Sequence, residues 1–175
     1  MRRVVSCVCL LLLVLFGAQA FADLNGASVT VNFLYPDINH VFVLGSGTVT
    51  GGGFTVNDVR QHDFTTYPSD ITLTNVFGLN VFFLTASFNG YQLVVNSGGS
   101  PITGVTIAFN DVTGFDASRI SFDATDVWVN MQSLTTTPGL DLQLDLQFVP
   151  EPGTIALLGT GVLGILGAAR RKLLP

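Results

Sequence analysis

The stretch that decides the fold class is LDLQLDLQF, residues 140–148. Side chains alternate between the two faces of a β-strand, so this pattern predicts a half-buried strand with one wet face. A helix would scatter the leucines around its axis. The predicted core face consists of Leu140, Leu142, Leu144, Leu146 and Phe148. The predicted wet face consists of Asp141, Gln143, Asp145 and Gln147.

The rest of the middle of the chain has the same character. Short runs rich in Val, Ile, Thr and Phe alternate with clusters of Gly, Asn, Asp, Ser and Pro, which is typical of strands and turns. The predicted strands are 28–34, 41–44, 48–50, 54–59, 70–74, 81–88, 91–96, 104–110, 120–122, 126–132 and 140–148. Many short strands without helices between them predict an all-β fold, a single antiparallel β-sandwich that is jelly-roll-like. A flattened barrel is the main alternative.

A hairpin is predicted within NVFFLTASFNGYQLVVNS, residues 80–97. Asn-Gly, here Asn89-Gly90, is a favoured two-residue turn because both positions need positive φ. This turn would pair Phe88 with Tyr91 and place one apolar face against the core. That face would consist of Phe82, Leu84, Ala86, Phe88, Tyr91, Leu93 and Val95.

Residues 1–22 resemble a signal peptide. Arg2 and Arg3 precede an apolar run over residues 4–16, and small residues follow, so cleavage is expected after Ala20 or Ala22. An uncleaved membrane anchor is the alternative. Both cysteines of the chain, Cys7 and Cys9, lie in this segment.

The middle of the chain is acidic. Residues 23–150 hold eleven Asp against two Arg, a formal charge of −9. Such a surface repels phosphate backbones, so we expect no nucleic-acid binding. With no cysteine between residues 23 and 150, thiolate metal sites and thiol nucleophiles are also excluded from this part of the chain.

The last residues have a distinct organisation. Val149, Pro150, Glu151 and Pro152 precede an uncharged run over residues 154–169, and a basic cluster of Arg170, Arg171 and Lys172 follows. As a helix, the run would span about 24 Å, which is short for a hydrocarbon core of about 30 Å. We predict a short transmembrane helix over 154–169 with the basic cluster as a cytoplasmic stop and the β domain outside.

This arrangement resembles the PEP-CTERM sorting signal, the bacterial tail that exosortase-type membrane enzymes are thought to recognise and cleave. The same tail has been labelled an ice-binding protein C-terminal domain. The resemblance implies an exosortase-type partner and a Gram-negative host that makes exopolysaccharide or biofilm matrix. It also implies inner-membrane anchoring, followed by release to the envelope or the extracellular space. The chain then divides into a signal peptide (1–22), a β-sandwich (23–148) and a sorting tail (149–175).

The middle of the chain offers little catalytic chemistry. His40 and His62 are the only histidines. His62-Asp63 could form part of a base, but no Gly-x-Ser-x-Gly elbow accompanies it, and we expect both histidines on the surface or in loops. We therefore expect no catalytic or cofactor-binding residue and no enzymatic activity. A secreted hydrolase is the weakest alternative.

The composition of the middle of the chain also bears on binding of calcium and of ice. Calcium prefers oxygen ligands, and four aspartates lie close in sequence, although no known calcium-loop spacing is matched. These four are Asp111, Asp116, Asp123 and Asp126. Threonine-rich strands could bind ice, but they form no regular array.

Trp128 is the only tryptophan and lies in DVWVNMQ, residues 126–132. Alternation predicts a core face of Val127, Val129 and Met131, which leaves Trp128 exposed beside the amides of Asn130 and Gln132. Such a group could stack on a sugar ring. Alternatively, Trp128 packs under a loop or between sheets.

Together these observations predict an exported, non-enzymatic β-sandwich with a structural or adhesive role. A glycan-binding module for exopolysaccharide, with Trp128 and Asn130 as contacts, is the alternative.

Overall fold

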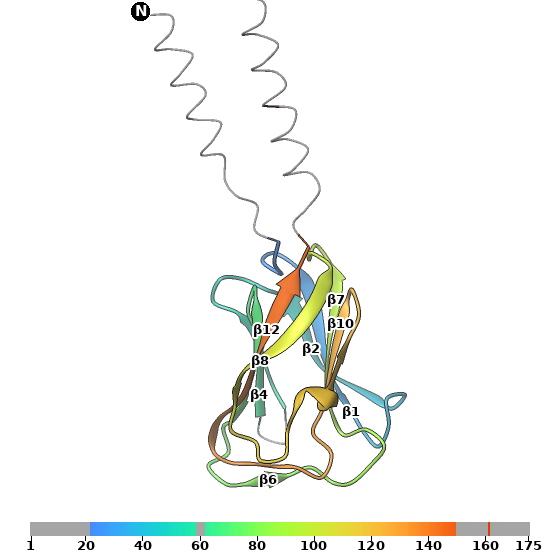
Figure 1. Ribbon diagram of the computed structural model, residues 1–175, viewed down its shortest axis with the longest axis vertical. Helices are drawn as coiled ribbons and strands as arrows, with labels where there is room; N and C mark the ends of the chain where they lie inside the picture. The colour runs from blue at the N-terminus through green and yellow to red at the C-terminus, as the bar shows by residue number, and fades with distance from the viewer. Residues whose placement is uncertain (1–21, 59–61, 150–160, 162–175) are drawn as a thin grey trace, which may run out of the picture. The chain divides into compact units, whose positions relative to one another are not determined.

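The computed structural model of this protein describes residues 22–58, 62–149 and 161 (Figure 1). Asp23–Val149 form one compact unit. Within the described part of this unit the structure has strands and one short 3₁₀ helix, η1 (Ala117–Arg119), and no α-helix. The all-β prediction is confirmed.

Ten strands form two five-stranded sheets. Sheet A has the order β2 (Val41–Thr48), β1 (Ser28–Leu34), β7 (Gly90–Ser97), β10 (Asp126–Asn130), β9 (Ile120–Phe122). Sheet B has the order β3 (Phe54–Asn57), β4 (His62–Thr66), β5 (Asp70–Asn75), β12 (Gly139–Phe148), β8 (Ile102–Asn110). A two-stranded sheet pairs β11 (Thr135–Thr136) with β6 (Val81–Phe82). Every pairing is antiparallel.

The two large sheets lie as two layers, with β4 and β12 in one and β7 and β10 in the other (Figure 1). Strands β1 to β5 follow one another around the two layers, because β1 pairs with β2 in sheet A and β3, β4 and β5 are successive neighbours in sheet B. A jelly roll contains two Greek keys, four-strand units in which the fourth strand returns to lie beside the first. Here β12 returns to lie beside β8 and β7 returns to lie beside β1. The structure supports the antiparallel sandwich, and the jelly-roll-like connectivity stays a prediction.

The core lies between the layers and comes from alternate residues of both sheets. Val29, Val31 and Phe33 of β1 face Phe64 of β4 and Leu144 of β12 within one buried cluster. Each such side chain contributes about 1.5–3 kcal/mol when it is fully removed from water. Aromatic contacts reinforce this cluster.

Strand β12 confirms most of the predicted alternation. Leu142, Leu144 and Leu146 are buried, Phe148 packs partly against the core, and Asp145 is exposed. Asp141 is the exception, because it is buried rather than wet. The register with β5 shifts between Leu140 and Leu142, so Asp141 is the extra residue of a β-bulge, and a bulge re-aims its side chain.

The predicted Asn89-Gly90 hairpin is wrong. Gly90 is the first residue of β7, where it lies opposite Leu34 of β1 and Asn130 of β10. A side chain at Gly90 would collide with the carbonyl oxygen of Val129, so glycine is required here by close strand packing and not by a turn. Tyr91 is buried against Phe33 with ring centroids 5.4 Å apart.

The segment before Asn89 also differs from the prediction. Only Val81–Phe82 form a strand, and Phe82 and Leu84 are exposed by 57% and 55% instead of facing the core. Ala86 and Phe88 are half-buried, whereas the predicted core positions Tyr91, Leu93 and Val95 are confirmed as buried. Strand β4, which begins at His62, was not predicted from the sequence at all.

The predicted signal peptide and the predicted helix over 154–169 fall almost entirely outside the described residues. Among the residues that the structure describes, no helix is long and apolar enough to cross a membrane.

Candidate functional site

Trp128 lies on the outer face of sheet A. The predicted division of β10 is confirmed, since Val127, Val129 and Met131 are buried whereas Trp128 and Asn130 are half-buried. Trp128 stands opposite Gln92 of β7 on one side and Ser121 of β9 on the other. The indole is thus flanked by polar side chains on both neighbouring strands.

A chain of hydrogen bonds crosses this outer face beside Trp128. The Asn32 amide donates to Gln92 Oε1 at 3.0 Å, and Gln92 Nε2 donates to Asp126 Oδ1 at 2.7 Å. Thr125 Oγ1 donates to the second oxygen of Asp126 at 2.7 Å. The chain fixes the Gln92 amide in one orientation, which preorganises the polar surroundings of the ring.

The side chain of Asn130 is less available for a glycan contact than the sequence indicated. Its Oδ1 accepts from the backbone N–H of Gln132 at 3.1 Å and from that of Asn89 at 3.3 Å. The Asn130 side chain therefore holds the end of β10 against the segment that precedes β7. A glycan contact from Asn130 would have to use its amide nitrogen.

Two of the four aspartates considered for calcium, Asp116 and Asp123, hold turns. Asp116 Oδ1 accepts from Ser118 N and Oγ at 2.8 and 2.6 Å, and these bonds lower the pKa of Asp116. Asp123 Oδ1 accepts from the backbone N–H of Thr125 and Asp126, each at 2.8 Å, which lowers the pKa of Asp123.

Asp126 belongs to the hydrogen-bond chain on the outer face. Asp111 donates its backbone N–H to the Asp141 carbonyl, beside β12. The described ranges contain no group of three His, Cys, Asp or Glu side chains that could hold a metal ion. The expectation of no bound cofactor or metal, with calcium as the alternative, stays a prediction.

The two histidines have different environments. His40 is exposed in the β1–β2 loop, where its Nδ1 lies 2.9 Å from Asp37 Oδ2. His62 is fully buried, which corrects the expectation of a surface or loop residue. Asp63 receives a hydrogen bond from Asn57 at 2.7 Å. Adjacent residues of β4 point to opposite faces, so the side chains of His62 and Asp63 do not combine into a catalytic base.

His62 belongs to a buried polar cluster that the sequence did not reveal. Its Nε2 lies 2.8 Å from Thr136 Oγ1 and 4.0 Å from Asp141 Oδ2, and Asp141 is 1% exposed. Burial lowers the pKa of His62 to about 4 and raises the pKa of Asp141 to about 6. Tyr91 donates to Asp58 Oδ2 at 3.1 Å nearby in the core. His62 and Asp141 meet only because the bulge in β12 turns the carboxylate inward.

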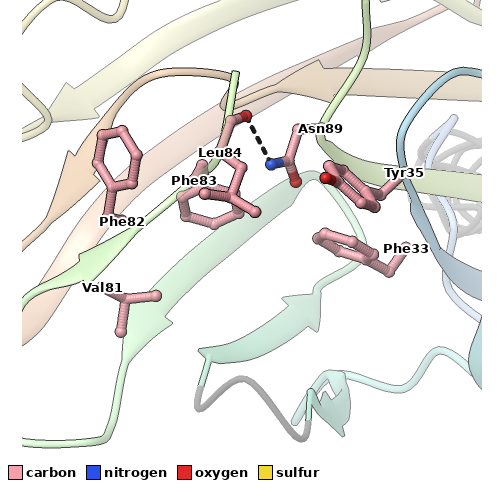
Figure 2. A pocket seen from close by; sticks show the side chains of 7 residues that line it. All are labelled: Phe33, Tyr35, Val81, Phe82, Phe83, Leu84 and Asn89. Atoms are coloured by element: carbon pink, nitrogen blue, oxygen red, sulfur yellow. Dashed lines mark hydrogen bonds between the residues drawn. The ribbon is translucent and has the colours of Figure 1, made fainter. Parts of the chain in front are cut away.

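A small cavity of about 140 Å³ opens near this buried polar cluster (Figure 2). Its lining is mostly apolar, and its polar side chain Asn89 donates to the Leu84 carbonyl at 2.8 Å. The lining consists of Phe33, Tyr35, Val81, Phe82, Phe83, Leu84 and Asn89. Neither His62 nor Asp141 is in that lining, so the cavity brings no substrate to the titratable pair.

The comparison with known proteins concerns the end of the chain. The family model of the PEP-CTERM protein-sorting motif matches residues 148–172. No curated protein and no solved structure matches the chain. The match contains all four predicted sorting residues from Val149 to Pro152 and the basic cluster from Arg170 to Lys172. Of these, only Val149 lies within the described residues. Residues 148–172 of this chain therefore carry the PEP-CTERM protein-sorting motif.

Proposed function

We propose that this protein is an exported, non-enzymatic β-sandwich that is sorted through its C-terminal motif to the cell envelope or extracellular matrix. The observation that carries the proposal is the position of the motif. It begins at Phe148, which is also the last residue of β12, so the final core strand runs directly into the sorting tail.

In this proposal the tail is a transient anchor. The prolines on either side of Glu151 favour an extended backbone, a conformation that a processing enzyme can bind. The apolar run 154–169 holds the chain in the inner membrane with the β domain outside, and Arg170, Arg171 and Lys172 stop transfer. An exosortase-type enzyme then removes the tail and releases the domain.

The proposed absence of catalysis is supported by the burial of His62 and Asp141, the neighbouring side chains whose pKa values are shifted. His62 and Asp141 are 0% and 1% exposed, so a substrate cannot reach them in the folded domain. A structural or adhesive role is the simplest function for such an exported domain.

The test is the intact mass of the protein from its host, in membrane and released fractions. The released wild-type protein should lack the tail. A variant with Pro150→Ala, Glu151→Gln and Pro152→Ala should keep it and stay in the membrane fraction. Pro138→Ala, in an exposed loop before β12, is the matched control and should be processed normally. A released wild-type protein that retains the full tail would contradict the proposal.

A second function, binding of exopolysaccharide, is favoured by the half-buried Trp128 between Gln92 and Ser121. Because Trp128 is the single tryptophan, its fluorescence reports this site without interference. Host polysaccharide should shift that emission, and Trp128→Ala should reduce co-sedimentation with the polymer. Phe109→Ala, at an exposed position on sheet B, is the control. Unchanged emission at saturating polysaccharide would exclude this second function.

A further inference from the structure

The edge of sheet A at β2 is open along its first half. β2 pairs with β1 on one side and ends the sheet on the other. One face of the second half of β2 is covered, since Val56 and Phe54 of β3 pack where side chains at Gly45 and Gly47 would stand. Among the residues that the structure describes, nothing comparable packs on the first half. There Val41, Phe42 and Val43 are exposed by 49%, 52% and 66%. Figure 1 shows the tip of the β1–β2 hairpin projecting from the sandwich.

The backbone of this half-strand is oriented to accept another strand. The Tyr35 N–H donates to the His40 carbonyl at 3.2 Å, and the next pairs in register are Leu34 with Val41 and Phe33 with Phe42. Bonded and non-bonded pairs alternate in an antiparallel ladder. It follows that the backbone N–H and C=O of Phe42 form hydrogen bonds with β1. The backbone N–H and C=O groups of Val41 and Val43 then point away from β1.

The two edges of sheet A differ in their protection. Folded β-proteins usually guard an open edge with charged residues or proline. Arg119 and Asp123 directly flank β9, the other edge strand. Residues 38–57, which include all of β2, contain no Asp, Glu, Lys, Arg or Pro. This stretch therefore holds none of the eleven aspartates that give the domain its formal charge of −9.

We propose that β2 is the docking edge for β2 of a second copy of this chain. The sequence Val41-Phe42-Val43 reads the same in both directions. An antiparallel pairing centred on Phe42 therefore sets Phe42 opposite Phe42 and each Val41 opposite a Val43 of the other copy. The outward backbone groups of the valines then meet outward backbone groups, and the contact is two-fold symmetric. Because this stretch lacks acidic residues, two acidic domains that meet along it bring few like charges together.

This contact joins two five-stranded sheets into one continuous sheet. Only a few residues of each copy take part, so the interface is smaller than those of stable dimers and the association is weak and concentration-dependent. It deepens the proposed adhesive role by naming the partner, and it relies on the proposed export only for the place where pairing occurs.

Cysteine cross-linking of the full chain in its host tests this pairing. The background carries Cys7→Ala and Cys9→Ala, so that any disulfide reports the introduced residue. Non-bonded partners in an antiparallel pair have Cα atoms about 4.5 Å apart, within reach of a disulfide. Phe42→Cys should therefore give a disulfide-linked dimer under mild oxidation. Val41→Cys should not, because two copies of residue 41 would be about 8 Å apart.

Two further variants make the result specific. The double variant Val41→Cys, Val43→Cys should cross-link, because each cysteine then faces the other. Phe122→Cys on β9 is the matched control, since Phe122 is also an exposed aromatic residue on an edge strand. It should remain monomeric. Adding Val43→Lys to Phe42→Cys should lower the dimer yield at least several-fold, because a charge is placed on each side of the contact.

Three outcomes would overturn the proposal. One is a Phe42→Cys protein that stays monomeric while its accumulation matches wild type. Another is an equal dimer yield at positions 41, 42 and 122, which would indicate association through another part of the chain. The third is a disulfide to a different protein, which would assign this edge to another partner. None of these outcomes depends on whether the tail is cleaved, so the sorting proposal stands or falls separately.

Discussion

Replacing Gly90 by alanine is the sharpest test of how the strands are paired. The added Cβ would collide with the carbonyl oxygen of Val129 and would lie 3.1 Å from the nitrogen of Met131. Both are backbone atoms at β10 or directly after it, and they cannot rotate aside as a side chain can. Strands β7 and β10 would have to separate where they begin to pair.

The cost follows from the kind of atom that is displaced. Overpacking of a core by a methyl-sized group costs about 1–3 kcal/mol. A collision with the backbone of a central strand belongs at the upper end, so we expect a loss of about 3 kcal/mol. That loss is a large part of the 5–15 kcal/mol that stabilises a typical domain. In a two-residue turn the same change would cost only roughly 1–2 kcal/mol, the strain of a positive φ.

Two other glycines separate these effects. Gly26 has a φ of +82° and open space around its Cβ position, so Gly26→Ala measures positive-φ strain alone. Gly51 also has open space around its Cβ position but no positive φ, so Gly51→Ala should be nearly neutral. Urea unfolding followed by Trp128 fluorescence gives all three free energies of unfolding, provided that the denaturant slope is unchanged. If Gly90→Ala lies within 1 kcal/mol of Gly51→Ala, the close packing of β7 on β10 is incorrect.

The remaining predictions concern buried and paired charges. Burial lowers the pKa of His62 to about 4 from 6.5, so its contribution to stability falls as the pH drops through this window. Burial raises the pKa of Asp141 to about 6 from 3.8, so its contribution is lost as the pH rises through that window. We expect the two opposite effects on the free energy of unfolding to cancel between pH 4 and 6. In Asp141→Asn only the His62 effect remains, so this variant should lose about 1.4 kcal/mol of stability per pH unit toward acid. A free energy of unfolding that does not change with pH in this variant would contradict the burial of neutral His62. Asp145 lies opposite Asp70, whose pKa is raised first by burial and then by this like charge. Asp145→Asn should therefore raise the urea midpoint at pH 7 but not at pH 3, and an equal shift at both would show that the charge is irrelevant.

Alternation along one strand could be read from the sequence because it is a local property. Leu142, Leu144 and Leu146 of β12 and the valines of β10 face the core as their period-two pattern predicts. The pattern says which face a residue occupies but not which strand lies beside it. Tyr91 therefore appeared to pair with Phe88 through a turn, whereas its partners are Phe33 and Val129, from strands distant in sequence.

The buried polar cluster escaped prediction for a related reason. The alternation placed Asp141 on the wet face, and only the register shift between β12 and β5 turns it inward. His62 was expected on the surface or in a loop, since HDFTT shows no clear alternation. In the structure this segment is β4, whose last three residues are all buried. A bulge or a strand covered on both faces leaves no period-two signal.

The sorting motif was predictable because it is a linear signal. Its recognition requires residues in order along the chain and not a folded surface, so residues 148–172 are identified by sequence alone. The domain is different, because Trp128, Gln92 and Ser121 come together only through the order of strands in sheet A.

The distribution of charge can be read from the sequence, but its position on the surface depends on the fold. The negative charge of the domain disfavours contacts between copies at its acidic surfaces, and 38–57 is a stretch without acidic residues on an open edge. The proposed export by a linear signal and the proposed self-association through a folded edge can therefore be tested independently, one by substitutions after β12 and the other by substitutions in β2.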